Sequence, residues 1–353
     1  MIIGRTPFRI SFFGGGTDYP QWFRENKGAV LSTSIDKYCY ISCRFLPPFF
    51  EHKTRLVYSK MELVKSIADL EHPAAKAVIQ YLGIGEGLEI HHDGDLPARS
   101  GIGSSSSFTV GLLNALTQLL GQNLSKEELA RQSIYIEQEI IKENVGSQDQ
   151  TSAVFGGLNL IEFLPSQKEE FDDIIVKPIA VQENIQKLES NLMLFYLGTS
   201  RLSSEIAGHF LNSIKEKKDL LKEMYQMVFE AKKIIESQNW DDDFGKLLHK
   251  SWMLKRSISP YISLSTIDIF YERALSLGAL GGKLLGAGGG GFFLLYARPE
   301  IQKKILQTFS PLILHVPFKF ENQGTQIIYG SSTSTHQEKR DQHEPSFNEK
   351  QYH

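Results

Sequence analysis

Cysteine, net charge and long apolar runs are all scarce in this chain of 353 residues. The two cysteines, Cys39 and Cys43, lie four residues apart on an expected strand, where they are poorly placed for a disulfide, and no other cysteine could complete a zinc site. A formal charge of −3 gives no reason to expect nucleic acid or an anionic membrane as a partner. No apolar run approaches the ~20 residues that span a bilayer, and the interrupted apolar start does not have the form of a signal peptide. We therefore expect a reduced, cytoplasmic, globular protein.

Two common nucleotide-binding patterns are missing as well. No G-x-x-x-x-G-K-[ST] run occurs, so a Walker A loop is not expected. The run GIGSSS has a serine where the third glycine of a dinucleotide fingerprint belongs. It also lacks the acidic residue that should follow about 20 residues later at the end of a strand. These absences argue against a Rossmann-type site.

The hydrophobic pattern indicates a mixed chain whose character changes near residues 180 to 190. The first part alternates strands such as PFRISFF with helices, one of which begins at a capping-box pattern at Ser125. The second part combines a long, broken helical stretch with several strands. We expect domains at residues 1–185 and 186–330, and a disordered polar tail at residues 331–353.

The segment LPARSGIGSSSSFTV, residues 96–110, places glycines and four consecutive serines before an apolar helical pattern. Glycines let the backbone approach a ligand closely. The first amides of a helix lack partners within the helix and lie at the positive end of its dipole, which favours phosphate binding. A glycine turn with one serine as N-cap is the alternative, although four serines exceed that need. The predicted phosphate-binding residues are Gly101, Ile102, Gly103, Ser104, Ser105, Ser106 and Ser107.

The segment PFRISFFGGGTDYP, residues 7–20, ends a strand in three glycines and Asp18. Exposed backbone beside a carboxylate suits a polyhydroxyl ligand, because Asp18 can accept hydrogen bonds from sugar hydroxyls. A glycine-rich turn capped by Asp18 is an equal alternative. Arg9 alternates onto the face opposite Phe8 and Ile10, and its pattern favours a surface position.

Two further carboxylates stand out downstream. Glu137 falls inside the apolar stripe of the helix that begins at Ser125, where a carboxylate needs a cation, whether a metal ion or a buried basic side chain. Glu139 falls off that stripe, and we expect it to be solvated. Asp149 precedes a helical pattern, which by itself favours a helix N-cap.

Two more segments combine small residues with possible ligand contacts. KLLGAGGGGFFLLY, residues 283–296, is too rich in glycine for ordinary packing, which indicates either a ligand contact or the crossing of two elements. LGTSRLSSEI, residues 197–206, offers amides, hydroxyls and Arg201 for a second anion site, or a capped helix with an exposed arginine.

Together these segments resemble the GHMP kinases, the superfamily of galactokinase, homoserine kinase, mevalonate kinase and phosphomevalonate kinase. PFRISFFGGGTDYP, LPARSGIGSSSSFTVGLL and KLLGAGGGGFFLLY are similar to its three motifs, in order, from Arg5 to Tyr296. RISFFGGGTDYP, GSQDQ and FGGLN look most similar to the bacterial D-glycero-D-manno-heptose 7-phosphate kinases. The resemblance implies an α+β, two-domain GHMP kinase fold. Its amino-terminal domain would be like ribosomal protein S5 domain 2, and its carboxy-terminal domain would be ferredoxin-like.

The resemblance also implies roles for individual residues. Asp149 corresponds to the catalytic aspartate, and Arg9 to an arginine near the transferring phosphoryl group. Ser105, or Ser106 if the register differs by one, and Glu137 would coordinate Mg²⁺. The implied substrate contacts are Asp18, Gly15, Gly16, Thr17, Arg201, Gly288 and Gly289.

The implied reaction is transfer of the γ-phosphoryl group of MgATP to the anomeric hydroxyl of heptose 7-phosphate. The product would serve the synthesis of a surface polysaccharide or lipopolysaccharide. ATP, Mg²⁺ and a sugar phosphate are the expected ligands, and the chain is expected to be a monomer or a homodimer. A kinase for a fucose- or galactose-like sugar and a non-catalytic sugar-binding protein are the alternatives.

Overall fold

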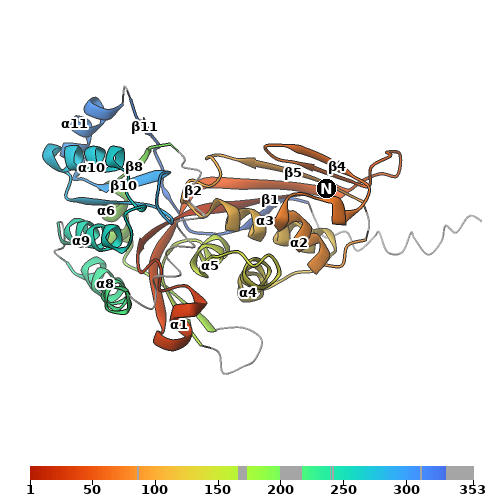
Figure 1. The fold of residues 1–353 in the computed structure, drawn as a ribbon, viewed down its shortest axis with the longest axis horizontal. Coiled ribbons are helices and arrows are strands. Elements are labelled where there is room, and N and C mark those ends of the chain that lie inside the picture. Colours follow the sequence, from red (N-terminus) through yellow and green to blue (C-terminus); the bar gives the residue numbers. More distant parts are fainter. Residues whose placement is uncertain are drawn as a thin grey trace, which may run out of the picture.

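The computed structural model describes residues 1–85, 87–165, 173–198, 217–238, 240, 242–310 and 312–330. Arg201 and the tail 331–353 therefore lie outside the described residues. Figure 1 shows two lobes, a large sheet with helices beneath it and a smaller sheet with its own helices. This α+β architecture agrees with the predicted fold class.

The first sheet has nine strands, six of them in the order β13-β1-β2-β5-β3-β4, with β12, β6 and β7 joined at the sides. The long antiparallel pair of β1 and β2 forms its centre. β6 and β12 both pair with β2, and β7 pairs with β6. The strands are β1 (Ile2–Phe13), β2 (Gly28–Phe45), β3 (Thr54–Val57), β4 (Met61–Val64), β5 (Leu88–Gly94), β6 (Leu158–Leu164), β7 (Asp173–Pro178), β12 (Phe320–Glu321) and β13 (Gln326–Tyr329).

Helices α2 to α5 cover one face of this sheet, and α3 packs directly on β1 and β2 (Figure 1). The predicted capping box at the start of α4 is present, with the side chains of Ser125 and Glu128 each bonded to the other's backbone amide. α4 continues into a single π-helical turn, η2, a local widening that proteins often place at functional sites. The helical elements of this lobe are α1 (Pro20–Asn26), η1 (Ile67–Asp69), α2 (Pro73–Tyr81), α3 (Ser104–Leu119), α4 (Lys126–Tyr135), η2 (Ile136–Ile140) and α5 (Gln148–Phe155).

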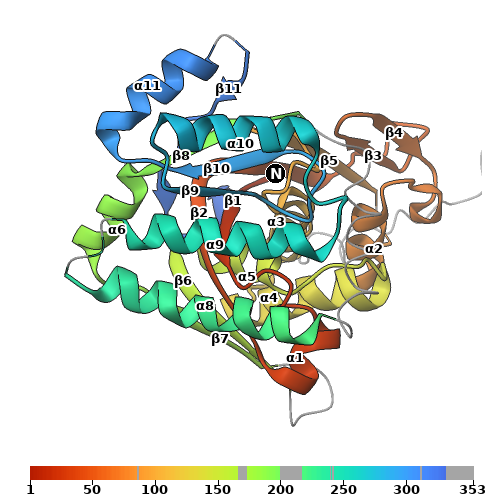
Figure 2. The same cartoon turned by 60° about the vertical axis from the view of Figure 1, so that its left-hand side comes forward.

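The second sheet is antiparallel in the order β11-β8-β10-β9. Figure 2 shows α9 and α10 in front of this sheet, and α8 beside α9. α8 also contacts β1 and β2, so it joins the two lobes. The elements are α6 (Gln182–Ser190), β8 (Leu192–Tyr196), α8 (Lys218–Glu236), α9 (Asp243–Ile258), α10 (Ser265–Leu277), β9 (Gly281–Leu284), β10 (Phe292–Tyr296), α11 (Pro299–Phe309) and β11 (Leu314–His315).

The chain returns to the first sheet after β11. β12 pairs with β2, and β13 pairs with β1. Residues 320–329, which the sequence assigned to the second domain, therefore contribute strands to the first. The hydrophobic pattern revealed these strands but not their partners, because pairing across roughly 300 residues leaves no local signal.

β1 is buried along almost its whole length, on both faces. Its apolar side chains Phe8, Ile10 and Phe12 lie in the core as predicted. The expectation that Arg9 lies at the surface is wrong, because only 4% of it is exposed. The Arg9 side chain is covered by the 101–103 segment, whose Ile102 carbonyl also accepts a 3.0 Å bond from the Arg9 backbone amide, and by Asp149 at the start of α5.

The cysteines and Glu139 lie where their sequence context predicted. Cys39 and Cys43 are buried free thiols, as expected. Glu139 is exposed, as its position off the apolar stripe predicted. No helix among the described residues is both long and apolar enough to cross a bilayer.

Candidate active site

The amino terminus of α3 is open toward the site. Gly103 occupies the N-cap position in a left-handed conformation with φ of 75°, and it offers no side chain to cap the helix. The next amides, those of Ser104 to Ser106, precede the first helical bond, which the Ser107 amide donates to the Gly103 carbonyl at 2.9 Å. The alternative of a simple serine N-cap is therefore wrong, and the free amides suit an anion.

The four serines have four different environments. The Ser104 hydroxyl accepts a bond from the Arg99 amide at 3.1 Å, and Ser105 is exposed. The buried Ser106 hydroxyl donates to a carboxylate oxygen of Glu137 at 2.8 Å. The Ser107 hydroxyl donates to the Pro7 carbonyl at 2.9 Å and ties the helix to β1. The serines therefore make several distinct contacts, whereas a simple N-cap would need only one serine.

Arg9 and Asp149 form a two-pronged ion pair below this helix terminus. The Arg9 Nε donates to Asp149 Oδ1 at 2.7 Å, and Nη2 donates to Oδ2 at 2.8 Å. The Arg9 Nη1 donates to the Gly101 carbonyl at 2.7 Å. A Cβ on Gly103 would lie 3.1 Å from Arg9 Cγ and 3.3 Å from Asp149 Oδ2, so the glycine brings the loop against the pair. Asp149 lies in the first turn of α5, and Ser147 holds the N-cap position instead.

Glu137 is almost fully buried within the π-helical turn. Its Oε2 accepts bonds from the Ser106 hydroxyl and from the Gln150 amide, whereas its Oε1 is buried without a partner. Burial raises the pKa of Glu137 to about 7. No described basic side chain pairs with Glu137, so the buried partner lysine or arginine that the sequence left open is not found among the described residues.

These groups fit a divalent cation. Glu137 has a buried carboxylate oxygen without a partner, and the Ser106 hydroxyl oxygen lies beside its other carboxylate oxygen; Mg²⁺ prefers such oxygen ligands. The arrangement favours Ser106 over Ser105 as the hydroxyl beside Glu137. Among the described residues, no cluster of three or more His, Cys, Asp or Glu could hold a metal ion without further ligands. Water or substrate oxygens would have to supply the rest.

The glycine loop after β1 holds a second buried carboxylate, Asp18. Its Oδ1 accepts a bond from the Gly16 amide at 2.9 Å, and its Oδ2 accepts from the Gln148 amide at 3.4 Å. Burial, together with the nearby charge of Asp149, raises the pKa of Asp18 to about 6. A Cβ on Gly146 would come within 1.9 Å of Asp18 Oδ2, so the segment before α5 packs directly on this carboxylate.

Two neighbours of Asp18 have contrasting surroundings. The Thr17 side chain is fully buried, and its hydroxyl lies 2.8 Å from each of the backbone carbonyl oxygens at positions 14 and 29, which ties the loop to β2. There is free space beside Gly15, because a Cβ added there would lie 3.7 Å from its nearest neighbour, the side-chain amide nitrogen of Gln148.

The glycines of residues 283–296 bring two backbones together. A Cβ on Gly286 would lie 2.5 Å from the Gly101 Cα, and one on Gly291 would lie 2.2 Å from the Ser100 carbonyl oxygen. Gly288 and Gly289 instead pack on Ile262, whose carbonyl accepts the Gly289 amide at 3.0 Å. The crossing of two elements therefore accounts for these glycines. Gly288 and Gly289 as substrate contacts remain a prediction.

Two lysines, the buried Lys283 and the half-buried Lys255, approach the same crossing. The Lys255 amine, on α9, donates to the carbonyls of Leu284 and Gly286. The Lys283 amine, on β9, donates to the Phe12 carbonyl at 2.8 Å. Burial, together with the nearby charge of Arg9, lowers the pKa of Lys255 to about 7. Burial also places the pKa of Lys283 well below its ordinary value, and the charges of Lys255 and Arg9 add to this effect.

The structure thus brings together Arg9, Asp149, Gly101, Gly103 and the pair of Ser106 and Glu137, with Asp18 close to Asp149. The sequence reasoning missed several other residues of the site. The repeated glutamines of GSQDQ were the sequence signal for two of them. In the structure, Gln148 and Gln150 each hold a buried side-chain carbonyl oxygen without a partner, which is unusual for a polar group that serves packing alone. The lysines gave no local signal. The missed residues are Gln148, Gln150, Lys255 and Lys283.

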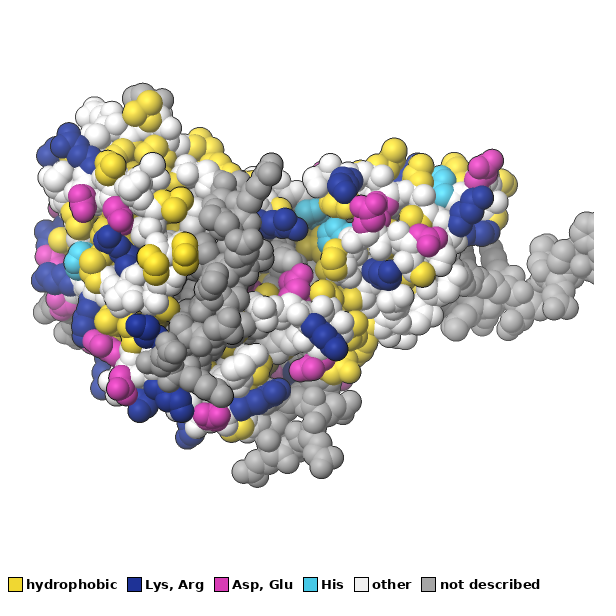
Figure 3. Space-filling model, in the orientation of Figure 1, with side chains coloured by type: hydrophobic (Ala, Val, Ile, Leu, Met, Phe, Trp, Pro, Cys, Tyr) yellow, Lys and Arg dark blue, Asp and Glu magenta, His cyan; other side chains and the backbone are white. Residues whose placement is uncertain are grey.

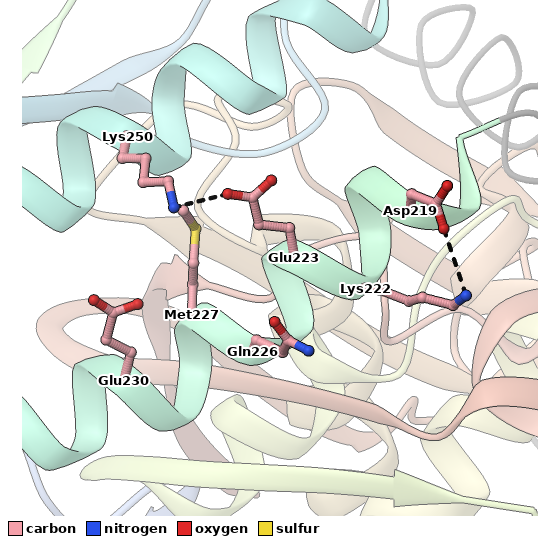
Figure 4. Close-up of a pocket in the computed structure, with 7 residues that line it drawn as sticks. All are labelled: Asp219, Lys222, Glu223, Gln226, Met227, Glu230 and Lys250. Carbon is pink, nitrogen blue, oxygen red and sulfur yellow. Dashed lines mark hydrogen bonds and ion pairs between the residues drawn. The ribbon is translucent and has the colours of Figure 1, made fainter.

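A hollow of about 380 Å³ between α8 and α9 lies outside this site. Figure 4 shows its charged side chains paired with one another, Lys250 with Glu223 and Lys222 with Asp219. None of its residues belongs to the three glycine-rich segments. On the face drawn in Figure 3, basic and acidic side chains are interspersed over the described residues, without a broad basic patch.

Models of known protein families match segments in both lobes. The model of the GHMP kinases N terminal domain matches residues 62–157, and that of the GHMP kinases C terminal domain matches residues 231–310. The chain belongs to the GHMP kinases. Its two lobes, the open α3 terminus and the glycine crossing are therefore those of a GHMP kinase.

Individual relatives are similar over nearly the whole GHMP kinase chain. A D-glycero-alpha-D-manno-heptose 7-phosphate kinase of Campylobacter jejuni is 28% identical over 86% of this chain and 91% of its own length. A galactokinase of Pyrococcus furiosus is 29% identical over 82% of this chain and 87% of its own. The crystal structure of a D-glycero-D-manno-heptose 1-phosphate kinase from Bacteroides thetaiotaomicron has a TM-score of 0.73 at 23% identity, covering 94% of this chain and all of that one. The domains and the named relatives support an ATP-dependent sugar kinase.

Proposed function

We propose that this GHMP kinase transfers the γ-phosphoryl group of MgATP to the anomeric hydroxyl of D-glycero-D-manno-heptose 7-phosphate, releasing ADP and the 1,7-bisphosphate. The observation that carries this proposal is the Arg9–Asp149 pair below the open amino terminus of α3. At this place Arg9 can donate hydrogen bonds to a phosphate, and Asp149 can accept the proton of a hydroxyl group.

The α3 amides and Arg9 supply positive potential where phosphoryl transfer needs it. Negative charge spreads over the γ-phosphoryl oxygens in the transition state, so catalysis consists mostly of positioning and charge stabilisation. Arg9 has five N–H donors, and three of them are used on Asp149 and Gly101. The other two remain for a phosphoryl oxygen. We assign the nucleotide phosphates to residues 101–107.

Asp149 acts as the proton acceptor for the attacking hydroxyl. Arg9 donates a hydrogen bond to each oxygen of Asp149, which fixes the plane of the carboxylate. Each oxygen keeps a lone pair that can accept a hydrogen bond from the substrate. About a quarter of the Asp149 side chain is exposed, so a hydroxyl can reach it. An anomeric hydroxyl is more acidic than an ordinary alcohol, and orientation by Asp149 is therefore a large part of its role.

Glu137 and Ser106 would hold Mg²⁺, which when bound offsets the negative charge of the phosphates. The unpartnered Oε1 of Glu137 supports this assignment. Asp18 would accept hydrogen bonds from sugar hydroxyls, because the Gly16 and Gln148 amides hold its carboxylate next to Asp149. Arg201 is proposed to bind the 7-phosphate of the sugar on the basis of its sequence context.

Relatives that act on unphosphorylated sugars define the second candidate. A galactokinase and a bifunctional fucokinase/GDP-fucose pyrophosphorylase of Arabidopsis thaliana are similar at 29% and 24% identity. A kinase for a galactose- or fucose-like sugar is therefore the alternative activity.

A panel of acceptors tests both activities. The purified chain is given MgATP and heptose 7-phosphate, the same heptose without phosphate, galactose or fucose, and ADP release is followed. We expect turnover to be fastest with heptose 7-phosphate, and a product that borohydride does not reduce, because its anomeric carbon carries the new phosphate. Faster turnover with an unphosphorylated sugar would favour the alternative, and sugar binding without any turnover would contradict both.

The role of Arg201 has its own test. Arg201→Ala should raise KM for the phosphorylated sugar far more than KM for ATP. Equal effects on the two KM values would remove Arg201 from the substrate site.

A further inference from the structure

The glycine crossing holds more buried positive charge than the described residues offset. Arg9 pairs with Asp149, but neither the Lys255 nor the Lys283 amine forms an ion pair within the described part of the chain. Both amines donate to backbone carbonyls instead. A buried ammonium without a counter-ion is costly, so such a cluster is expected to bind an anion or to lose protons.

The two lysines differ in what they can reach. Lys283 is 4% exposed, and its amine donates a hydrogen bond to the Phe12 carbonyl within the core. Lys255 is less buried, and its amine bonds to the Gly286 carbonyl. Gly286 packs on Gly101, the residue whose carbonyl also receives Arg9. Lys255 therefore sits at the junction between the proposed nucleotide loop and the Arg9–Asp149 pair.

The number of N–H donors on Lys255 depends on whether its amine is neutral or protonated. A neutral amine has two N–H donors, and the two carbonyl bonds use both of them. An ammonium has three donors. The third N–H donor would have no partner in the described structure unless an anion bound beside Lys255.

We propose that Lys255 contacts the terminal phosphates of the bound nucleotide through a third N–H donor, which its amine gains by taking up one proton as the anion binds. The inference rests on the proposed nucleotide site and goes beyond it, because it couples binding to proton uptake. The step is R–NH₂ + H⁺ → R–NH₃⁺, with the proton taken from solvent. The titratable and charged groups that act on Lys255 are the Arg9 guanidinium and the Lys283 amine, with Asp149 held by Arg9.

The free amine is suited to this exchange. Burial and the charge of Arg9 lower the pKa of Lys255 to about 7. An arriving polyanion would raise that pKa, because an opposite charge nearby favours the charged form. A rise of about two units would give uptake of roughly 0.8 of a proton per nucleotide at pH 8.

Calorimetric titration of the purified chain with a non-hydrolysable ATP analogue tests the coupling. Two buffers of different ionisation enthalpy at pH 8 report the number of protons taken up. We expect Lys255→Met to abolish the Lys255 share of the uptake and to weaken binding at least tenfold. Lys255→Arg should retain binding without that uptake, because its charge is permanent. Because Glu137 and Asp18 also titrate near neutral pH, the difference between wild type and Lys255→Arg is the quantity that decides.

Lys250→Met is the matched control, because Lys250 is an exposed lysine on the same helix that pairs with Glu223. It should leave both affinity and uptake unchanged. Equal uptake in wild type, Lys255→Met and Lys255→Arg would overturn the inference. The assay measures binding alone, so this result leaves the proposed sugar-kinase activity standing. Failure of every sugar in the acceptor panel, conversely, would leave the coupling intact.

Discussion

The Arg9–Asp149 pair predicts that the charge of Asp149 matters much more for catalysis than for stability. Asp149→Asn keeps the side-chain shape, but an amide N–H would replace the oxygen that accepts one Arg9 donor. The lost charge-assisted bond is worth about 1.5 to 3 kcal/mol in the free energy of unfolding, toward the lower end because Asp149 is 24% exposed. Loss of the proton acceptor should lower kcat about 10²- to 10⁴-fold, or roughly 3 to 5 kcal/mol in the barrier.

A second arginine–aspartate pair provides the control. Arg256 and Asp268 lie 2.9 Å apart at the start of α10, and Asp268 is 28% exposed. Asp268→Asn should therefore lower the melting temperature by a similar amount while kcat stays within twofold. Kinetics by ADP release and thermal unfolding of the three proteins settle the comparison. A kcat for Asp149→Asn within tenfold of wild type, or an equal loss in both variants, would refute the role of Asp149.

Three further predictions concern Glu137, Gly103 and Asp18. The folded pKa of Glu137, about 7, lies above the unfolded value near 4.5, so the metal-free protein should lose stability as pH rises between these values. Glu137→Gln should remove that loss, up to about 3 kcal/mol, and thermal melts should show Mg²⁺ stabilising wild type but not the variant. Gly103→Ala should lower kcat more than Gly121→Ala, because both have φ near +75° but only Gly103 has the ion pair within 4 Å. Asp18→Asn should raise KM for the sugar and leave KM for ATP within twofold, as initial rates against each substrate would show; an equal rise in both would remove Asp18 from the sugar site.

The elements that the sequence revealed best are those with local causes. The helix at Ser104 follows from a glycine turn and an apolar repeat, and the start of α4 follows from the bonds between Ser125 and Glu128. Burial of Glu137 could be read from its place on an apolar stripe, although the π-helical turn that carries it could not. Such features need only neighbours within a few residues.

The failures have distant causes. Alternation along β1 indicated one polar face, yet Arg9 is buried because parts of the chain far from it in sequence cover that face. Lys255 and Lys283 read as ordinary basic residues until the crossing at Gly286 and Gly101 surrounds them. Their chemistry comes from tertiary packing, for which a single sequence carries no period or spacing.

The pairing of β13 with β1 has a consequence for how this protein can be made. The first strand synthesised finds one of its two neighbours only after residue 329 has left the ribosome. Until then the β1 edge presents unsatisfied amides and carbonyls, a template for association with other chains. The first lobe therefore completes its sheet after the second has been translated, and a truncated chain ending near residue 185 would be prone to aggregate.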